Sequence, residues 1–129
     1  MATATGERAW RREILAVTMR VSEDERTVVQ PAVGLVLDES PEDETAPAMA
    51  AYAARLGAAV ALRAAMDTGD LPAGTEFGPV RELVRRVRLD YLEIVETNYD
   101  ETHEDHWGRR EALRIIVGCE SLLARLGID

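Results

Sequence analysis

The chain has 129 residues, of which 47% are hydrophobic and 5% aromatic, so it is long and apolar enough for one folded domain. Its formal net charge of −9 repels phosphate backbones and anionic lipids, and we expect neither a nucleic-acid partner nor a membrane. It has no lysine for a phosphate loop, no second cysteine for an internal disulfide and no apolar signal peptide, so we expect a cytoplasmic protein.

The first forty residues are compatible with two structures. Four apolar residues recur at helical spacing: Trp10, Ile14, Val17 and Val21. Ser22 and Glu25 are a capping pair for a second helix, which would kink at Pro31. However, two stretches rich in β-branched residues, LAVTMRV and TVVQPAVGLVL, flank a polar turn, which is also typical of a β-hairpin. We favour the helices, because an isolated hairpin is only marginally stable.

An alanine-rich helix is predicted over about residues 41–66. Ser40 and Pro41 are typical of a helix start, because serine caps the first turn and proline is tolerated within it. Beyond that turn the charged residues are Arg55 and Arg63, which would each cost roughly 2.5–3.5 kcal/mol at the centre of a bilayer. We therefore expect a helix buried against other helices and not one that spans a membrane.

Glycine and proline recur in residues 68–78, which predicts a loop. This loop separates an N-terminal part, residues 1–67, from a C-terminal helical hairpin, residues 79–127. The chain has the size of one domain, so we expect both parts to belong to a single helical domain, residues 1–129.

The C-terminal hairpin contains two strongly periodic helices, predicted over residues 79–97 and 102–126. The first has apolar residues along one face: Val80, Leu83, Val84, Val87, Tyr91, Ile94 and Val95. The second has an apolar arc that covers more than half of its circumference: Leu113, Ile115, Ile116, Val117, Cys119, Leu122, Leu123 and Leu126. A helix this apolar is either central to a bundle or part of a subunit interface, and we expect a homodimer or another protein partner.

The segment between these helices, NYDETHEDHW, concentrates both histidines of the chain among carboxylates. His103 and His106 are three residues apart, so on a helix they share one face, with Asp100 and Glu104 nearby. Histidine and carboxylate ligands at such spacings hold iron, manganese or zinc in helical bundles, which makes these four residues the candidate metal site. No Glu-x-x-His motif accompanies them, and the acids also suit a helix start, so we favour a polar hinge without a cofactor.

Glu120 lies within the apolar arc of the last helix, where a carboxylate needs a partner or acquires a raised pKa. We favour an ion pair with Arg55 or Arg63, because these arginines on the alanine-rich helix need partners for the same reason. The alternative makes Glu120 an acid–base catalytic group, or makes Arg55 and Arg63 a binding site for an anionic ligand.

These patterns predict a mainly α fold, a compact bundle of four to five helices, with a β-hairpin in the first forty residues as the alternative. The sequence carries no complete set of familiar catalytic motifs. We therefore expect a small acidic cytoplasmic protein that acts as a non-catalytic protein–protein interaction or dimerisation module. The alternative is a small helical metal-binding protein or enzyme that holds a divalent metal at the histidine and carboxylate cluster of residues 100–106.

Overall fold

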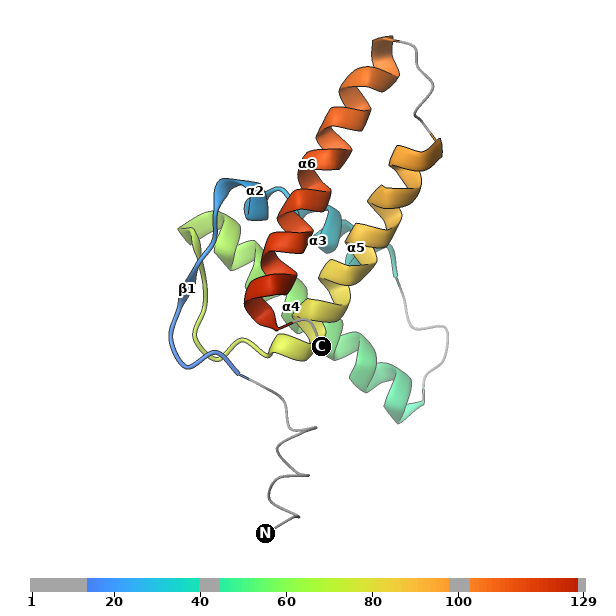
Figure 1. Cartoon of the computed structure of the whole chain (residues 1–129). Coiled ribbons are helices and arrows are strands. Elements are labelled where there is room, and N and C mark those ends of the chain that lie inside the picture. The colour runs from blue at the N-terminus through green and yellow to red at the C-terminus, as the bar shows by residue number, and fades with distance from the viewer. Residues whose placement is uncertain (1–13, 40–44, 98–102, 128–129) are drawn as a thin grey trace, which may run out of the picture.

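A computed structural model describes residues 14–39, 45–97 and 103–127, the side chains of residues 103–107 excepted. The described elements, in chain order, are β1 (Met19–Arg20), α2 (Glu23–Arg26), α3 (Val29–Asp38), α4 (Ala46–Thr68), β2 (Asp70–Leu71), α5 (Phe77–Thr97) and α6 (His103–Leu126). The prediction of a mainly helical fold is confirmed. Figure 1 shows α5 and α6 side by side as a hairpin whose far end extends beyond the other elements.

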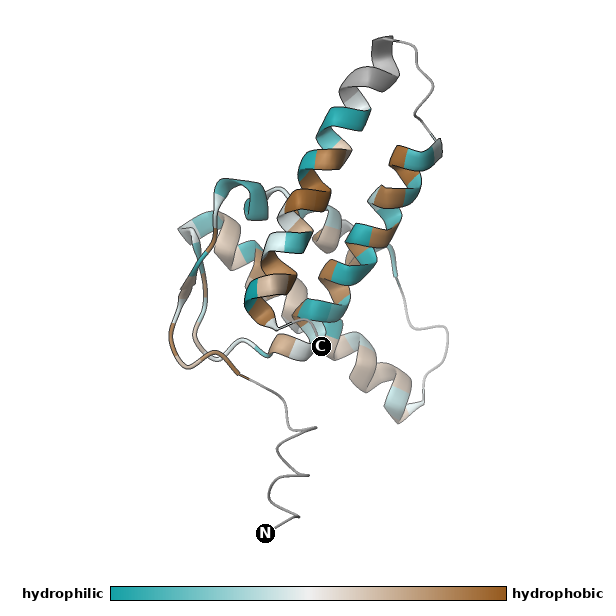
Figure 2. Ribbon diagram, viewed as in Figure 1, coloured by the Kyte–Doolittle hydropathy of each residue, from teal (hydrophilic) through white to brown (hydrophobic). Residues whose placement is uncertain are grey.

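The alanine-rich helix α4 differs in composition from the two helices of the hairpin. Figure 2 shows α4 as a mostly pale ribbon, whereas strongly hydrophilic and strongly hydrophobic residues alternate along α5 and α6. The helix begins after Thr45, whose side chain accepts a hydrogen bond from the amide of Ala48 at 3.4 Å. The predicted start near residue 41 is therefore wrong, because Thr45 is extended and caps the helix; Ser40 and Pro41 themselves lie outside the described residues. Gly69, with a φ of 87°, ends the helix in the left-handed conformation that glycine adopts most easily.

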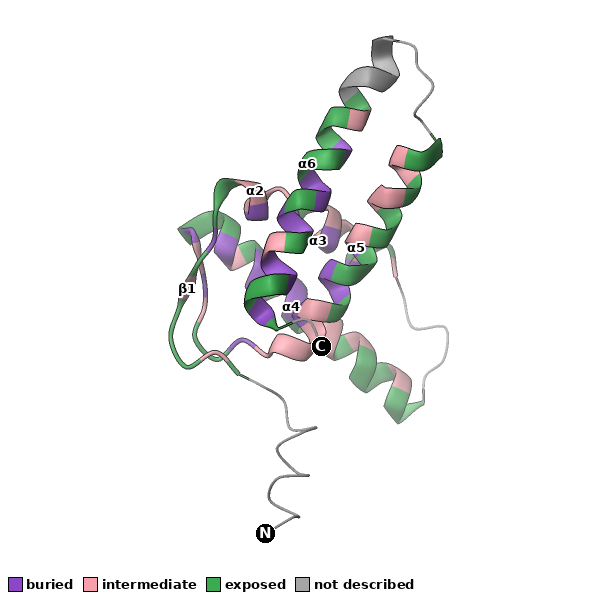
Figure 3. Cartoon of the chain, viewed as in Figure 1, coloured by how far each residue is buried: buried purple, intermediate pink, exposed green. Residues whose placement is uncertain are grey.

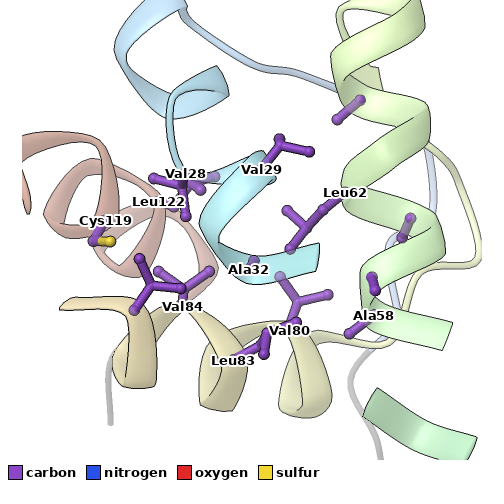
Figure 4. Packing of buried hydrophobic residues seen from close by; sticks show 14 of the residues in the cluster. Val28, Val29, Ala32, Ala58, Leu62, Val80, Leu83, Val84, Cys119 and Leu122 are labelled. Atoms are coloured by element: carbon purple, nitrogen blue, oxygen red, sulfur yellow. The ribbon is translucent and has the colours of Figure 1, made fainter. Parts of the chain in front are cut away.

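The core is centred on α3 and covers only part of the hairpin. Figure 3 shows that the buried residues of α5 and α6 gather in the half of the hairpin that lies alongside α2, α3 and α4. Ala32 of α3 is fully buried in the same cluster as Leu62 of α4, Val80 of α5 and Leu122 of α6 (Figure 4). Burying a valine or leucine side chain contributes about 1.5–3 kcal/mol. These contacts therefore fix which side of each helix faces inward.

The first forty residues contain parts of both predicted structures. Residues 14–21 are not helical: Ile14 forms a bridge with Glu76, and β1 pairs antiparallel with β2, with Met19 opposite Leu71. The partner strand lies in the loop after α4, so local spacing along the first forty residues contained no sign of it. The second strand of the alternative hairpin is instead helix α3.

Helix α2 begins with the predicted capping pair. The hydroxyl of Ser22 accepts a hydrogen bond from the amide of Glu25 at 3.2 Å, and the carboxylate of Glu25 accepts one from the amide of Ser22 at 2.9 Å. The predicted kink at Pro31 is wrong, because α2 ends at Arg26 and a separate helix begins at Val29. Pro31 lies in the first turn of that helix, where its missing N–H costs no hydrogen bond.

Candidate interaction surface

Large apolar side chains remain exposed on the side of the α5–α6 hairpin that faces away from the core. Leu89 of α5 is 63% exposed, and Leu113 and Val117 of α6 are 44% and 52% exposed. Leu113 and Val117 are four residues apart, so they follow one another along one side of α6. The rest of the predicted apolar arc is buried: Ile115, Ile116, Cys119, Leu122, Leu123 and Leu126. The arc is therefore wider than the core that covers it.

Two contacts define which residues of α5 and α6 lie at the same level. Arg88 donates hydrogen bonds from Nε and Nη2 to Oε2 of Glu120, at 3.2 and 3.1 Å. Arg81 donates from Nη1 to the backbone oxygen of Gly127 at 2.6 Å. Seven residues forward along α5, from 81 to 88, thus correspond to seven residues back along α6, from 127 to 120. The two helices run antiparallel without a shift between these levels.

A groove of about 550 Å³ lies beside the ion pair between α5 and α6. Its lining combines apolar and charged side chains: Arg85, Arg88, Leu89, Glu120 and Leu123. The charged residues of this lining are of both signs, and Arg88 and Glu120 are paired with each other. Val117 and Leu113 lie about one and two helical turns before Glu120 on α6, and we call the groove together with these two exposed residues the outer face. Apolar side chains bordered by charges of both signs are typical of protein–protein interfaces.

The structure changes the assignment of partners for Glu120. Its side chain is 52% exposed and pairs with Arg88, so the predicted pair with Arg55 or Arg63 is wrong. Glu120 lies at the edge of the apolar arc, where α5 passes beside it, and not at the covered centre. Arg55 forms an ion pair as expected, but with Glu39, at 2.7 Å between Nε and Oε1. Arg63 is exposed beside a groove between α3 and α4. The catalytic role of Glu120 and the anion site at the two arginines stay predictions.

A fully buried carboxylate is found instead at Glu25 in α2. It accepts hydrogen bonds from Nη1 of Arg125 and from the hydroxyl of Ser121, both at 2.6 Å. Burial raises the pKa of Glu25, but the hydrogen bonds from Ser121, the Ser22 amide and Arg125 outweigh this and hold the pKa below its ordinary value. The sequence indicates the capping role of Glu25, whereas its partners on α6 are 96 and 100 residues away and leave no local signal.

The candidate metal site lies in the part of the chain whose side chains the structure does not describe: Asp100, His103, Glu104 and His106. It therefore stays a prediction. Among the side chains that the structure does describe, no group of three or more His, Cys, Asp or Glu residues is placed to hold a metal ion.

The thiol of Cys119 belongs to the core of the fold. It is fully buried on α6, and burial raises its pKa to about 12. The thiol therefore stays protonated at neutral pH and packs as a small apolar group, without the thiolate character that a nucleophile needs.

Comparison of the chain with protein-family models, with curated proteins and with solved structures finds no match. No helix in the described ranges combines the length and the apolar composition that crossing a membrane requires.

Proposed function

We propose that this chain is a non-catalytic protein–protein interaction module that forms a homodimer through the outer face of its α5–α6 hairpin, in the reducing environment of the cytoplasm. The observation that carries the proposal is the joint exposure of Leu89, Leu113 and Val117 beside the Arg88–Glu120 pair. Full burial of such a side chain contributes about 1.5–3 kcal/mol, and because these three are already partly buried, covering what remains exposed contributes roughly half of that each. A second copy supplies an identical face that would cover them.

An apolar stripe on α4 is another candidate for this role. Met49, Leu56 and Val60 are 45%, 36% and 67% exposed and recur on one side of that helix. Their neighbours on α4 are mostly alanine, and a single helix carries the whole stripe. The outer face of the hairpin instead joins two helices and has charges of both signs beside its apolar residues, which gives an interface both an apolar centre and a polar rim.

A matched pair of substitutions separates the two faces. Val117→Asp places a carboxylate in the outer face, and we expect it to weaken dimerisation by about tenfold or more in sedimentation velocity, because the charge would be desolvated on association. Val60→Asp makes the same change on α4 and should leave the dimer unaffected. Both sites are exposed, so thermal melting in dilute solution should stay close to that of the wild type. If Val60→Asp dissociates the dimer and Val117→Asp does not, the interface lies on α4 and the proposal is wrong.

A further inference from the structure

We infer that the second copy binds with its two-fold axis parallel to the helices of the hairpin, so that α5 of each copy lies on α6 of the other. This inference rests on the proposed function, because it assigns the geometry of the same interface. Two copies that present the same face to each other are related by a two-fold axis lying in the plane of the interface. An axis close to the helix direction and an axis close to the perpendicular direction are the two that let the helices of both copies pack along their lengths, and they bring different residues together.

The level of each residue in the hairpin decides what meets at such an interface. A rotation about an axis along the helices leaves every residue at its own height, so α5 faces the residues of α6 that lie level with it. Arg88 and Glu120 are level, because they are hydrogen-bonded to each other within one copy. A rotation about an axis across the helices instead places α5 on α5 and α6 on α6.

The charge pattern favours the axis along the helices. Arg88 of one copy then faces Glu120 of the second copy, and the reverse pair forms as well, so four charges of alternating sign meet. With the axis across the helices at this level, Arg88 would face Arg88 and Glu120 would face Glu120, and like charges placed together oppose binding.

The apolar residues match under the same axis. Leu89 is one residue beyond Arg88 on α5, and Val117 is three residues before Glu120 on α6, so the two lie within one helical turn of the same level. An axis along the helices therefore places Leu89 of each copy against Val117 of the other. Both contacts bury side chains that are more than half exposed in a single copy.

The test exchanges the two charges within one chain. The doubly substituted chain R88E/E120R keeps an intramolecular ion pair and should dimerise with itself as well as the wild type does. If the axis runs along the helices, a mixed dimer of variant and wild type would place like charges opposite each other. Wild type should then pair with wild type and variant with variant. An axis across the helices would favour the mixed dimer instead. Native mass spectrometry of isotope-labelled wild type and unlabelled variant distinguishes the three kinds of dimer.

We expect mixed dimers to fall from about half of all dimers, the statistical share for equivalent chains, to about a tenth or less. The control exchanges the Arg114–Asp24 pair, which has the same 3.1 Å separation on the flank of α6 that faces α2. Wild type and R114E/D24R should mix statistically. If R88E/E120R forms mixed dimers at half of the total or more, the inferred axis is overturned while the proposed dimer stands. If the wild type forms no dimer at all, both proposals are overturned.

Discussion

Arg125, near the end of α6, donates a hydrogen bond across 2.6 Å to the buried carboxylate of Glu25, a residue 100 positions earlier in the chain. The same guanidinium donates from Nη2 to the backbone oxygen of Arg20 at 2.7 Å. The hydroxyl of Ser121 donates a hydrogen bond to the other carboxylate oxygen of Glu25. One cluster of polar contacts thus joins β1 and α2 to α6, and it fixes the rotation of α6 that leaves part of its apolar arc facing outward.

Replacing the buried carboxylate should destabilise the fold. Glu25→Gln leaves Arg125 without its counter-charge, and we expect a loss of about 2–4 kcal/mol in the free energy of unfolding. Glu23, an exposed acid in the same helix, provides the control, and Glu23→Gln should change this free energy by less than about 1 kcal/mol. Urea unfolding followed by circular dichroism measures both changes. Equal losses at the two positions would show that the buried pair does not hold α2 to α6.

The same carboxylate should make stability depend on pH. Although burial raises the pKa of Glu25, its hydrogen bonds hold the folded-state pKa below the ordinary value of 4.5. The contribution of the ionised carboxylate is therefore fully present above pH 4.5 and is lost as the pH falls through the lower folded-state pKa. The difference in unfolding free energy between wild type and Glu25→Gln should be constant from about pH 6 to 8 and shrink under more acidic conditions. A difference that grows on acidification would contradict this assignment.

Two glycines of α6 should respond in opposite directions to the same substitution. A Cβ at Gly118 would overlap the backbone carbonyl of Asp24 and lie 3.0 Å from Cγ2 of Val28, so Gly118→Ala should cost about 1–3 kcal/mol by forcing α2 away from α6. A Cβ at Gly108 would meet nothing within 4 Å, and Gly108→Ala should gain about 0.5–1 kcal/mol from helix propensity. Thermal and urea unfolding of the two variants test the contrast. A gain in stability for Gly118→Ala would rule out the close approach of α2 to α6.

Dimerisation should strengthen as salt is added, although ion pairs would form across the proposed interface. Two copies of net charge −9 held about 25 Å apart repel by on the order of 10 kcal/mol in unscreened water. A Debye length of about 8 Å at physiological ionic strength removes most of this repulsion. An exposed pair such as Arg88–Glu120 contributes only about 0.2–1 kcal/mol, so relief of the repulsion is the larger effect. The dissociation constant measured by sedimentation equilibrium should decrease as the sodium chloride concentration rises from roughly 0.02 to 0.3 M. A rise would mean that charge pairs dominate the interface.

The helices of the hairpin could be predicted because their periodicity is local. Val80, Leu83, Val84 and Val87 recur at helical spacing, and all four are at most 3% exposed in the structure. The same method could not predict the pairing of β1 with β2. Each strand is two residues long, and three helices separate the two strands in the sequence. A strand of two residues is too short to show the alternation of apolar and polar residues that identifies strands. The sequence also contains no regular spacing that would indicate which distant segments pair.

The candidate surface was only partly predictable from the sequence for a related reason. The wide apolar arc of α6 indicated an interface, but a projection of one helix cannot show which part of its arc a neighbouring helix covers. Leu113 and Glu120 therefore belonged to the same predicted arc as Cys119, whereas in the structure Cys119 is buried and the other two are exposed. Glu25 shows the converse, because its position in a polar turn, SEDER, gave no sign of a buried carboxylate.

The molar mass of the wild-type chain in solution tests the proposed homodimer most directly. Sedimentation equilibrium over about 1 µM to 1 mM covers the affinities that interfaces of modest size reach. We predict that the mass rises with concentration toward twice the 14.2 kDa of a single chain and then levels off. A mass that stays at 14.2 kDa throughout this range would contradict a homodimer formed through the outer face.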